Sequence, residues 1–199
     1  MTQVGDKAPH TAAGPATEET DDVLVTRYQG GDVAAFDALY ARHRGPLFRY
    51  FRRQVDDASA NDLYQEVWMK FINHADSYEP RGRFQAYLFT LAHNVLMDFY
   101  RRQPSAQLVD PTKEGTPLTM TEDPTGDPAQ QVDAATMHAR LHDEVRRLPL
   151  HQRTAWLIRQ ETGMSLKQIA DVTQTSLEGV RSRLRYANDK LKAGMARYV

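Results

Sequence analysis

RFQAYLFTLAHNVLMDFYRR, residues 83–102, is the stretch that decides the fold. At about 3.6 residues per helical turn, its apolar side chains recur every three or four positions and form one unbroken stripe. The members of this stripe are Phe84, Tyr87, Leu88, Leu91, Ala92, Val95, Leu96 and Phe99. Because such a stripe needs a core to pack on, the pattern predicts an amphipathic helix inside a helical domain.

The opposite side of this helix is not purely polar. It combines aromatic, thioether and imidazole groups with polar neighbours, namely Phe89, His93, Met97 and Tyr100 beside Thr90, Asn94 and Arg101. Two interpretations are open. Neighbouring helices could cover both sides, or the rings and cations could face outward and bind unpaired nucleotides, whose bases stack on rings while their phosphates meet positive charge.

This stretch, together with the YEPRGR motif at residues 78–83, resembles the second conserved region of bacterial RNA polymerase sigma factors. The compact chain looks like the extracytoplasmic-function group of that family. There, this helix and the preceding loop separate the promoter strands at the minus-ten element and hold a flipped base, which offsets part of the cost of unpairing. The resemblance implies minus-ten contacts and strand opening by Arg81, Arg83, Tyr87, Asn94, Asp98, Arg101 and Arg102.

The segment before the loop, NDLYQEVWMKFINH at residues 61–74, is a second amphipathic helix. Its polar side, considered by periodicity alone, is an ordinary solvated face. However, DLYQEVWMKF at residues 62–71 is similar to the segment with which sigma factors grip the clamp helices of the largest polymerase subunit. The resemblance implies contacts with core polymerase by Asp62, Gln65, Glu66 and Met69.

Nearer the N-terminus, residues 1–20 are rich in Thr, Ala, Gly, Pro and acid, which predicts a disordered tail. A short helix is expected from Asp21 or Asp22 to Gln29, before Gly30 and Gly31. Asp32 is a plausible N-cap for the next helical pattern. Because Gly45 and Pro46 interrupt that pattern, residues 32–54 are either one bent helix or two abutting ones. The first domain is thus expected over residues 21–104.

Downstream, Pro104 ends the helix. Residues 105–133 have a net charge of −5, several prolines and no periodicity, which predicts a flexible acidic linker. This linker is either an inert spacer or a polyanion that lies in the positively charged channel that later carries nucleic acid. The second domain, residues 134–199, has a net charge of +6. Its pattern predicts four helices, of which the third opens with a capping box made by Ser165 and Gln168.

Two short helices joined by the turn at residues 173–175 predict a helix-turn-helix, whose second helix enters the major groove. Residues 148–192 resemble the sigma-factor region that binds the minus-35 element. The resemblance implies DNA contacts by Ser176, Glu178, Arg181, Ser182 and Arg185. One departure is Gln174, which stands where such turns commonly carry Gly. A left-handed backbone there would cost on the order of 1 kcal/mol, so either the turn differs or stability elsewhere absorbs the strain.

Several classes of protein are excluded or disfavoured by composition. The chain has no Cys, and hence no disulfide or thiolate site, and it shows neither a signal peptide nor a membrane span. Phosphate-loop, HExxH and GxSxG motifs do not occur, so no catalytic residue is expected. His138 and His142 lie one helical turn apart without a third ligand nearby. We therefore expect no metal and no other cofactor.

The fold class predicted by these patterns is all-α, with two small helical domains joined by a flexible acidic linker. The resemblance implies a cytoplasmic transcription initiation factor, associated with the nucleoid when bound to polymerase. Its partners would be the clamp helices and flap of core RNA polymerase, promoter DNA and an inhibitory anti-sigma factor. One alternative is a helix-turn-helix repressor or activator that binds duplex DNA unaided; a recombinase-like enzyme is disfavoured because the carboxylates lie mostly in the tail and linker.

Overall fold

The computed structural model describes residues 19–103 and 134–198. Within these ranges all regular structure is helical, which confirms the all-α prediction for them. The predicted tail (apart from residues 19 and 20) and the predicted linker at 105–133 lie outside the described residues. None of the helices in the two described ranges is long and apolar enough to cross a membrane.

The first unit contains four α-helices and one 3-10 turn. They are α1 (Asp21–Gln29), α2 (Val33–Arg52), α3 (Asp57–His74), η1 (Ala75–Ser77) and α4 (Phe84–Arg102). The N-caps follow from local chemistry, since side chains of Thr20, Asp32 and Asp56 each accept a hydrogen bond from a backbone N–H of the first turn. Pro46 lies inside α2, so residues 33–52 form one continuous helix.

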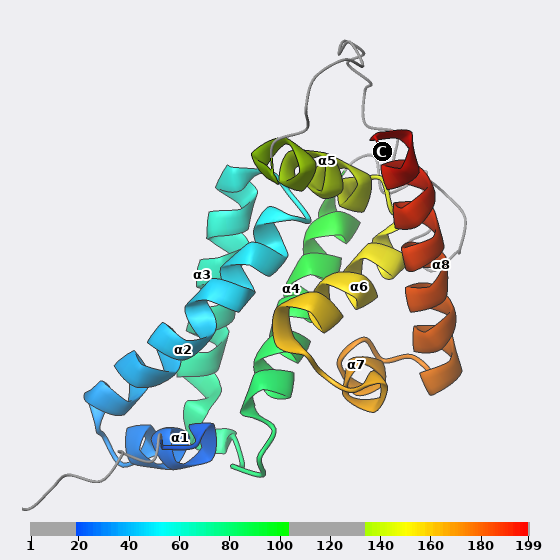
Figure 1. The fold of residues 1–199 in the computed structure, drawn as a ribbon. Helices are drawn as coiled ribbons and strands as arrows, with labels where there is room; N and C mark the ends of the chain where they lie inside the picture. The colour runs from blue at the N-terminus through cyan, green and yellow to red at the C-terminus, as the bar shows by residue number, and fades with distance from the viewer. Residues whose placement is uncertain (1–18, 104–133, 199) are drawn as a thin grey trace, which may run out of the picture.

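Aromatic rings fill the space between α2, α3 and α4. Phe51, Phe71 and Phe84 are fully buried, and the ring centroids of Phe71 and Phe84 are 5.1 Å apart. Burying one such side chain contributes about 1.5–3 kcal/mol. This packing fixes the start of α4 against α3 and thereby places the loop that joins them (Figure 1).

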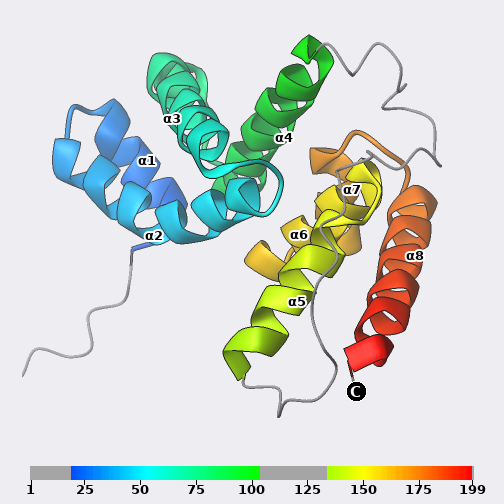
Figure 2. The same ribbon diagram turned by 90° about the horizontal axis from the view of Figure 1, so that it is seen from above.

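The second unit also has four α-helices. They are α5 (Ala134–Arg146), α6 (Leu150–Thr162), α7 (Leu166–Val172) and α8 (Leu177–Met195), followed by η3 (Ala196–Tyr198). The predicted capping box is confirmed: Ser165 Oγ accepts from the Gln168 N–H, and Gln168 Oε1 accepts from the Ser165 N–H. Viewed from above, the two units lie side by side, and α6 and α7 contact α4 while α6 also contacts α2 (Figure 2). We call this the closed arrangement.

The turn between α7 and α8 keeps the left-handed geometry although it has no glycine. Gln174 has φ +50° and is the one non-Gly residue in the described ranges with positive φ. The strain foreseen from the sequence is therefore present.

Gln174→Gly is expected to stabilise the protein by about 0.5–1 kcal/mol, because glycine adopts this conformation without a Cβ clash although it adds entropy to the unfolded chain. Urea unfolding followed by circular dichroism measures the difference. Thr175→Gly, at a neighbouring position without positive φ, should destabilise instead. A destabilised Gln174→Gly variant would show that the Gln174 side chain contributes more than its backbone costs.

Candidate functional site

The helix α4 has an exposed polar side. Tyr87, Asn94, Asp98 and Arg101 follow one another at intervals of seven, four and three residues, so they lie along one line of the helix. Asn94 and Arg101 are exposed, while Tyr87 and Asp98 are half-buried. Asp98 forms an ion pair with Arg101. The structure thus brings four of the seven predicted minus-ten residues onto one accessible surface.

A different side of α4 is covered. Phe89 is fully buried and packs against Tyr50 of α2, with ring centroids 5.5 Å apart. His93 is buried as well, and Met97 and Tyr100 are half-buried. The interpretation that these rings face outward to stack with bases is therefore wrong for the closed arrangement, and neighbours cover both apolar sides. The sequence pattern could not distinguish the two interpretations, because both sides of the helix carry aromatic residues.

The loop before α4 supplies the other predicted minus-ten residues except Arg102. Arg81 and Arg83 are exposed, and Arg81 forms an ion pair with Glu79. The Tyr78 ring lies against the Tyr87 ring, with centroids 4.6 Å apart. The loop therefore places positive charge next to an aromatic pair, a combination that suits phosphates and unpaired bases.

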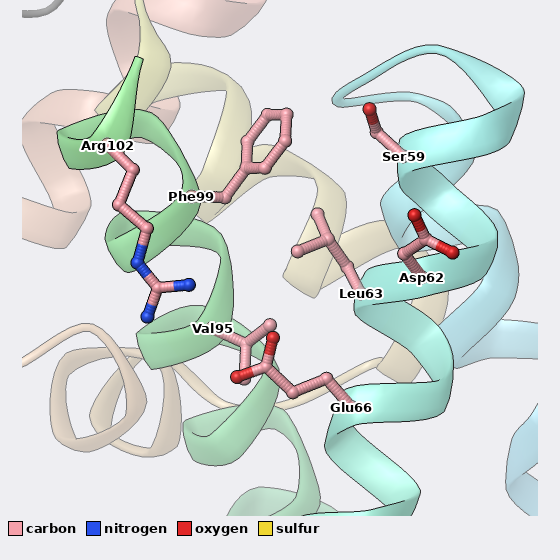
Figure 3. A pocket seen from close by; sticks show the side chains of 7 residues that line it. All are labelled: Ser59, Asp62, Leu63, Glu66, Val95, Phe99 and Arg102. Carbon is pink, nitrogen blue, oxygen red and sulfur yellow. The ribbon is translucent and has the colours of Figure 1, made fainter.

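A groove between α3 and α4 joins residues from two predicted sites (Figure 3). Its lining consists of Ser59, Asp62, Leu63, Glu66, Val95, Phe99 and Arg102. Carboxylates from α3 stand on one side, the Arg102 guanidinium comes from the end of α4, and apolar side chains lie between them (Figure 3). Ser59 and Phe99 were not among the predicted site residues. The only sequence signal for Phe99 was its place on the apolar stripe of α4, four residues after Val95.

The predicted polymerase contacts form an accessible strip on α3. Asp62 and Gln65 are exposed, and Met69 keeps 55% of its surface accessible, which is high for a large apolar side chain. Glu66 is half-buried and pairs with Lys70, one helical turn on, at 3.3 Å. An exposed thioether among carboxylates and amides is suited to a protein partner.

The predicted minus-35 residues lie on the N-terminal half of α8. Ser176 is the N-cap, and its Oγ accepts a hydrogen bond from the Gly179 N–H. Arg181 and Arg185 are exposed; the Arg181 guanidinium lies 3.4 Å from Glu178, and that of Arg185 lies 5.0 Å from the centre of the Tyr186 ring. Ser182 is half-buried. The helix thus presents two cations where a helix-turn-helix meets DNA.

Both units match known families. Residues 39–105 match the family description Sigma-70 region 2, and residues 146–193 match Sigma-70, region 4. The chain belongs to the sigma-70 family. The surfaces on α3 and α4 lie within the region 2 match, which begins after α1. The surface on α8 lies within the region 4 match.

The similarity extends over most of the sigma factor chain. The chain is 24% identical over 181 residues to the ECF RNA polymerase sigma-E factor of Haemophilus influenzae. The aligned region covers 89% of this chain and 96% of that relative. The chain is also 29% identical over 183 residues to the RNA polymerase sigma-H factor of Pseudomonas aeruginosa, covering 88% and 93%. This sigma factor is a member of the extracytoplasmic-function group.

A solved structure has the same fold. The structure of CnrH in complex with the cytosolic domain of CnrY superposes with a TM-score of 0.66 and 22% sequence identity, covering 91% of this chain and all of that one. The likeness supports the all-helical, two-unit fold of the sigma factor.

A buried polar network joins the two units of this sigma factor. Arg153 of α6 is 4% exposed; its Nε donates to Gln54 Oε1 at 2.9 Å and its Nη2 donates to the Tyr100 hydroxyl at 2.9 Å. Tyr100 in turn donates to the Gln54 carbonyl oxygen at 2.7 Å. Each of these groups has a hydrogen-bond partner across the interface. Separating the units would therefore leave several polar atoms unsatisfied unless water replaced the lost partners.

An ion-paired cluster reinforces the same interface. The Glu161 carboxylate, at the end of α6, accepts from Arg49 Nε at 2.8 Å and from Arg53 Nη1 at 2.7 Å. Its side chain is only 4% exposed, whereas Arg49 of α2 and Arg53, the C-cap of α2, reach solvent. One carboxylate shielded from water therefore holds two cations of the other unit.

His93 adds a titratable group to the interface. Its pKa is lowered to about 4, because burial disfavours the charged imidazole and because His151 and Arg183 place positive charge beside it. Its Nδ1 is buried and has no hydrogen-bond partner within the described ranges. The imidazole is thus neutral in the folded protein at neutral pH.

Acid is therefore expected to destabilise the sigma factor through His93. As pH falls from about 6.5 towards about 4, the unfolded chain binds a proton that the folded chain does not, so this contribution to stability is lost over that window. At pH 5.5 the loss relative to pH 7.5 is roughly 1 kcal/mol. Urea unfolding of the parent and of His93→Leu at both pH values measures it. His74→Gln, which alters an exposed imidazole, is the control; an unchanged pH dependence in His93→Leu would contradict this assignment.

Proposed function

We propose that this chain binds core RNA polymerase and directs it to specific promoters, and that it performs no catalysis itself. The observation that carries the proposal is that one chain presents two accessible surfaces in separate units: the polar strip of α3 and the cationic half of α8. The polymerase supplies the chemistry, and the sigma factor supplies the choice of start site. Such a factor acts in the cytoplasm, where polymerase and chromosome meet.

The polymerase contacts are assigned to α3. Asp62, Gln65, Glu66 and Met69 would meet the clamp helices of the largest subunit. The strip is supported by its accessibility and by the exposed Met69, which can adapt to an apolar pocket on the partner. The unit over residues 21–104 thus carries both polymerase binding and recognition of the minus-ten element.

Strand opening is assigned to α4 and its preceding loop. Tyr87, Asn94, Asp98 and Arg101 line one side of α4, and the cations of the loop, Arg81 and Arg83, stand at its start, with Arg102 at its end. Aromatic and polar groups on that surface can bind unstacked bases, while the arginines neutralise phosphates.

The minus-35 contacts are assigned to the unit over residues 134–199. Arg181 and Arg185 provide charge for phosphates or guanine edges, while Ser176, Glu178 and Ser182 offer polar groups beside them. In the closed arrangement this helix is tied to α2 and α4 through α6 and α7. Engaging two promoter elements at once therefore requires the units to move apart, and an anti-sigma factor that holds them together would block the function.

The decisive experiment is co-purification of the full chain with bacterial core RNA polymerase, followed by run-off transcription from a genomic DNA pool. Stable association and new discrete start sites are expected. If the chain fails to associate and instead shifts specific duplex DNA unaided, a helix-turn-helix repressor or activator replaces this proposal.

A further inference from the structure

The short helix α1 is bonded to the loop that precedes α4, although the two are far apart in sequence (Figure 1). Gln29 Nε2 donates to the carbonyl oxygens of Ala75 and Tyr78, each at 2.8 Å. Both bonds are partly shielded from solvent, and one amide thus satisfies two carbonyls, one at the start of η1 and one at the start of the loop. Two such bonds together typically favour one pose of the backbone about tenfold or more.

A second bond from α1 holds the far end of the same loop. The Asp22 carboxylate accepts from the backbone N–H of Gly82. Gly82 has φ +68°, a left-handed conformation that a side chain would disfavour. Asp22 and Gln29 are seven residues apart and so lie on one side of α1, two turns from each other.

The helix α1 is itself fixed to the core of the first unit. Asp21 pairs with Arg42 at 2.5 Å and with His43 at 2.8 Å, both on α2, and His43 is 4% exposed. Leu24 and Val25 of α1 are buried. The loop is therefore attached to a rigid support and not to a freely moving segment.

Between the two bonded positions, Tyr78 and Gly82, the loop has a short exposed segment. Glu79, Pro80 and Arg81 are exposed, while Tyr78 is held with its ring against Tyr87. The positions of the Tyr78 ring and of Arg81 thus depend on where α1 holds the loop backbone. Recognition of a single base requires donors, acceptors and stacking planes to be held within a fraction of an ångström.

We propose that Gln29 and Asp22 are positioning residues that fix the pose of residues 78–83 and thereby set which base of the minus-ten element is accepted. The inference rests on the proposed function, because it assigns the loop to an opened DNA strand. Neither residue contacts the base. With the bonds removed, the loop occupies several poses, so transcription continues and discrimination between bases falls.

The test uses full-length holoenzyme on a promoter first identified by run-off transcription. Each position of its minus-ten element is randomised in turn, and transcripts from the four bases are counted. Gln29→Ala and Asp22→Ala are expected to lower the preference at one position about fivefold, the equivalent of about one hydrogen bond. Asp22→Asn, whose amide oxygen can still accept from the Gly82 N–H, should keep the parental preference.

Arg27→Ala is the matched control, since Arg27 lies on the same helix but pairs with Glu19 and Asp32. It should leave the base preference unchanged. Parental preference in Gln29→Ala and Asp22→Ala would overturn the inference, and so would an equal loss of transcription for all four bases. If the parent chain neither binds polymerase nor yields start sites, the proposed function itself fails, which is a separate result.

Discussion

Reversing the charge of Glu161 is expected to separate the two units. The Glu161 carboxylate is almost fully shielded and accepts from Arg49 and Arg53 of the other unit. Glu161→Arg would remove this attraction and place a third cation against the two arginines. Breaking a buried ion pair typically costs about 3–5 kcal/mol; because both arginines reach solvent, we take the lower end of this range, and the ratio of closed to open chains should fall by about a hundredfold.

The chain is well suited to measuring this separation because it contains no cysteine. Cysteines introduced as Asp37→Cys on α2 and Asp189→Cys on α8, both exposed sites, accept one donor and one acceptor dye. Energy transfer between them reports the closed arrangement. It should be high in the parent and low in Glu161→Arg.

The matched control restores the pairing with opposite charges. Glu161→Arg combined with Arg49→Glu and Arg53→Glu should recover most of the energy transfer, because the attraction is the same with the signs exchanged. Equal energy transfer in the parent and in Glu161→Arg would show that the ion pairs do not hold the units together. If Glu161→Arg lowers the energy transfer and the triple variant does not restore it, the geometry of the native ion pairs, and not their charge alone, holds the units together.

Separation changes which surfaces DNA can reach. In the closed arrangement Tyr100 of α4 is bonded to Arg153 of α6, and His93 is buried near His151 and Arg183 of the second unit. Opening releases both side chains, next to the exposed line through Asn94 and Arg101. Opening would thus expose part of the surface that the outward-facing interpretation requires, namely His93 and Tyr100, whereas Phe89 stays packed against Tyr50 within the first unit.

The helices themselves were predictable because their signals are local. Apolar residues at helical spacing marked α3 and α4, and the capping residues Asp32 and Ser165 marked where α2 and α7 begin. Gly163, left-handed at φ 67°, ends α6 as expected of a C-cap glycine. Pro46 left two possibilities open for α2, and the structure shows a single helix.

The contacts between distant residues were not predictable. Gln54, Arg153 and Glu161 are polar, and a pattern of hydrophobicity assigns polar residues to the surface, yet all three side chains are shielded in the interface. The bonds of Gln29 and Asp22 to the loop span 46 to 60 positions and leave no periodic signal. Such pairs become visible only when packing brings two helices together.

The second large effect is expected at Glu66, where Glu66→Lys should abolish stable association with core polymerase. Glu66 lies on the accessible side of α3, on the groove that also contains Asp62 and Arg102. The substitution replaces a carboxylate with a cation beside Lys70 and Arg102. A surface of mixed charge therefore becomes predominantly positive. A partner surface that attracts Glu66 repels a cation in its place, and such a like-charge contact across an interface costs several kcal/mol, which corresponds to a loss of affinity of about a hundredfold or more.

Fluorescence anisotropy of the labelled chain titrated with core polymerase measures this affinity. Asp76→Lys makes the same change of charge at an exposed site outside the groove and should bind like the parent. Circular dichroism establishes that both variants keep their helices, since Glu66 contributes only one exposed ion pair to the fold, with Lys70. If Glu66→Lys and Asp76→Lys bind equally well, the polar strip of α3 is simply solvated and the polymerase must bind elsewhere on the chain.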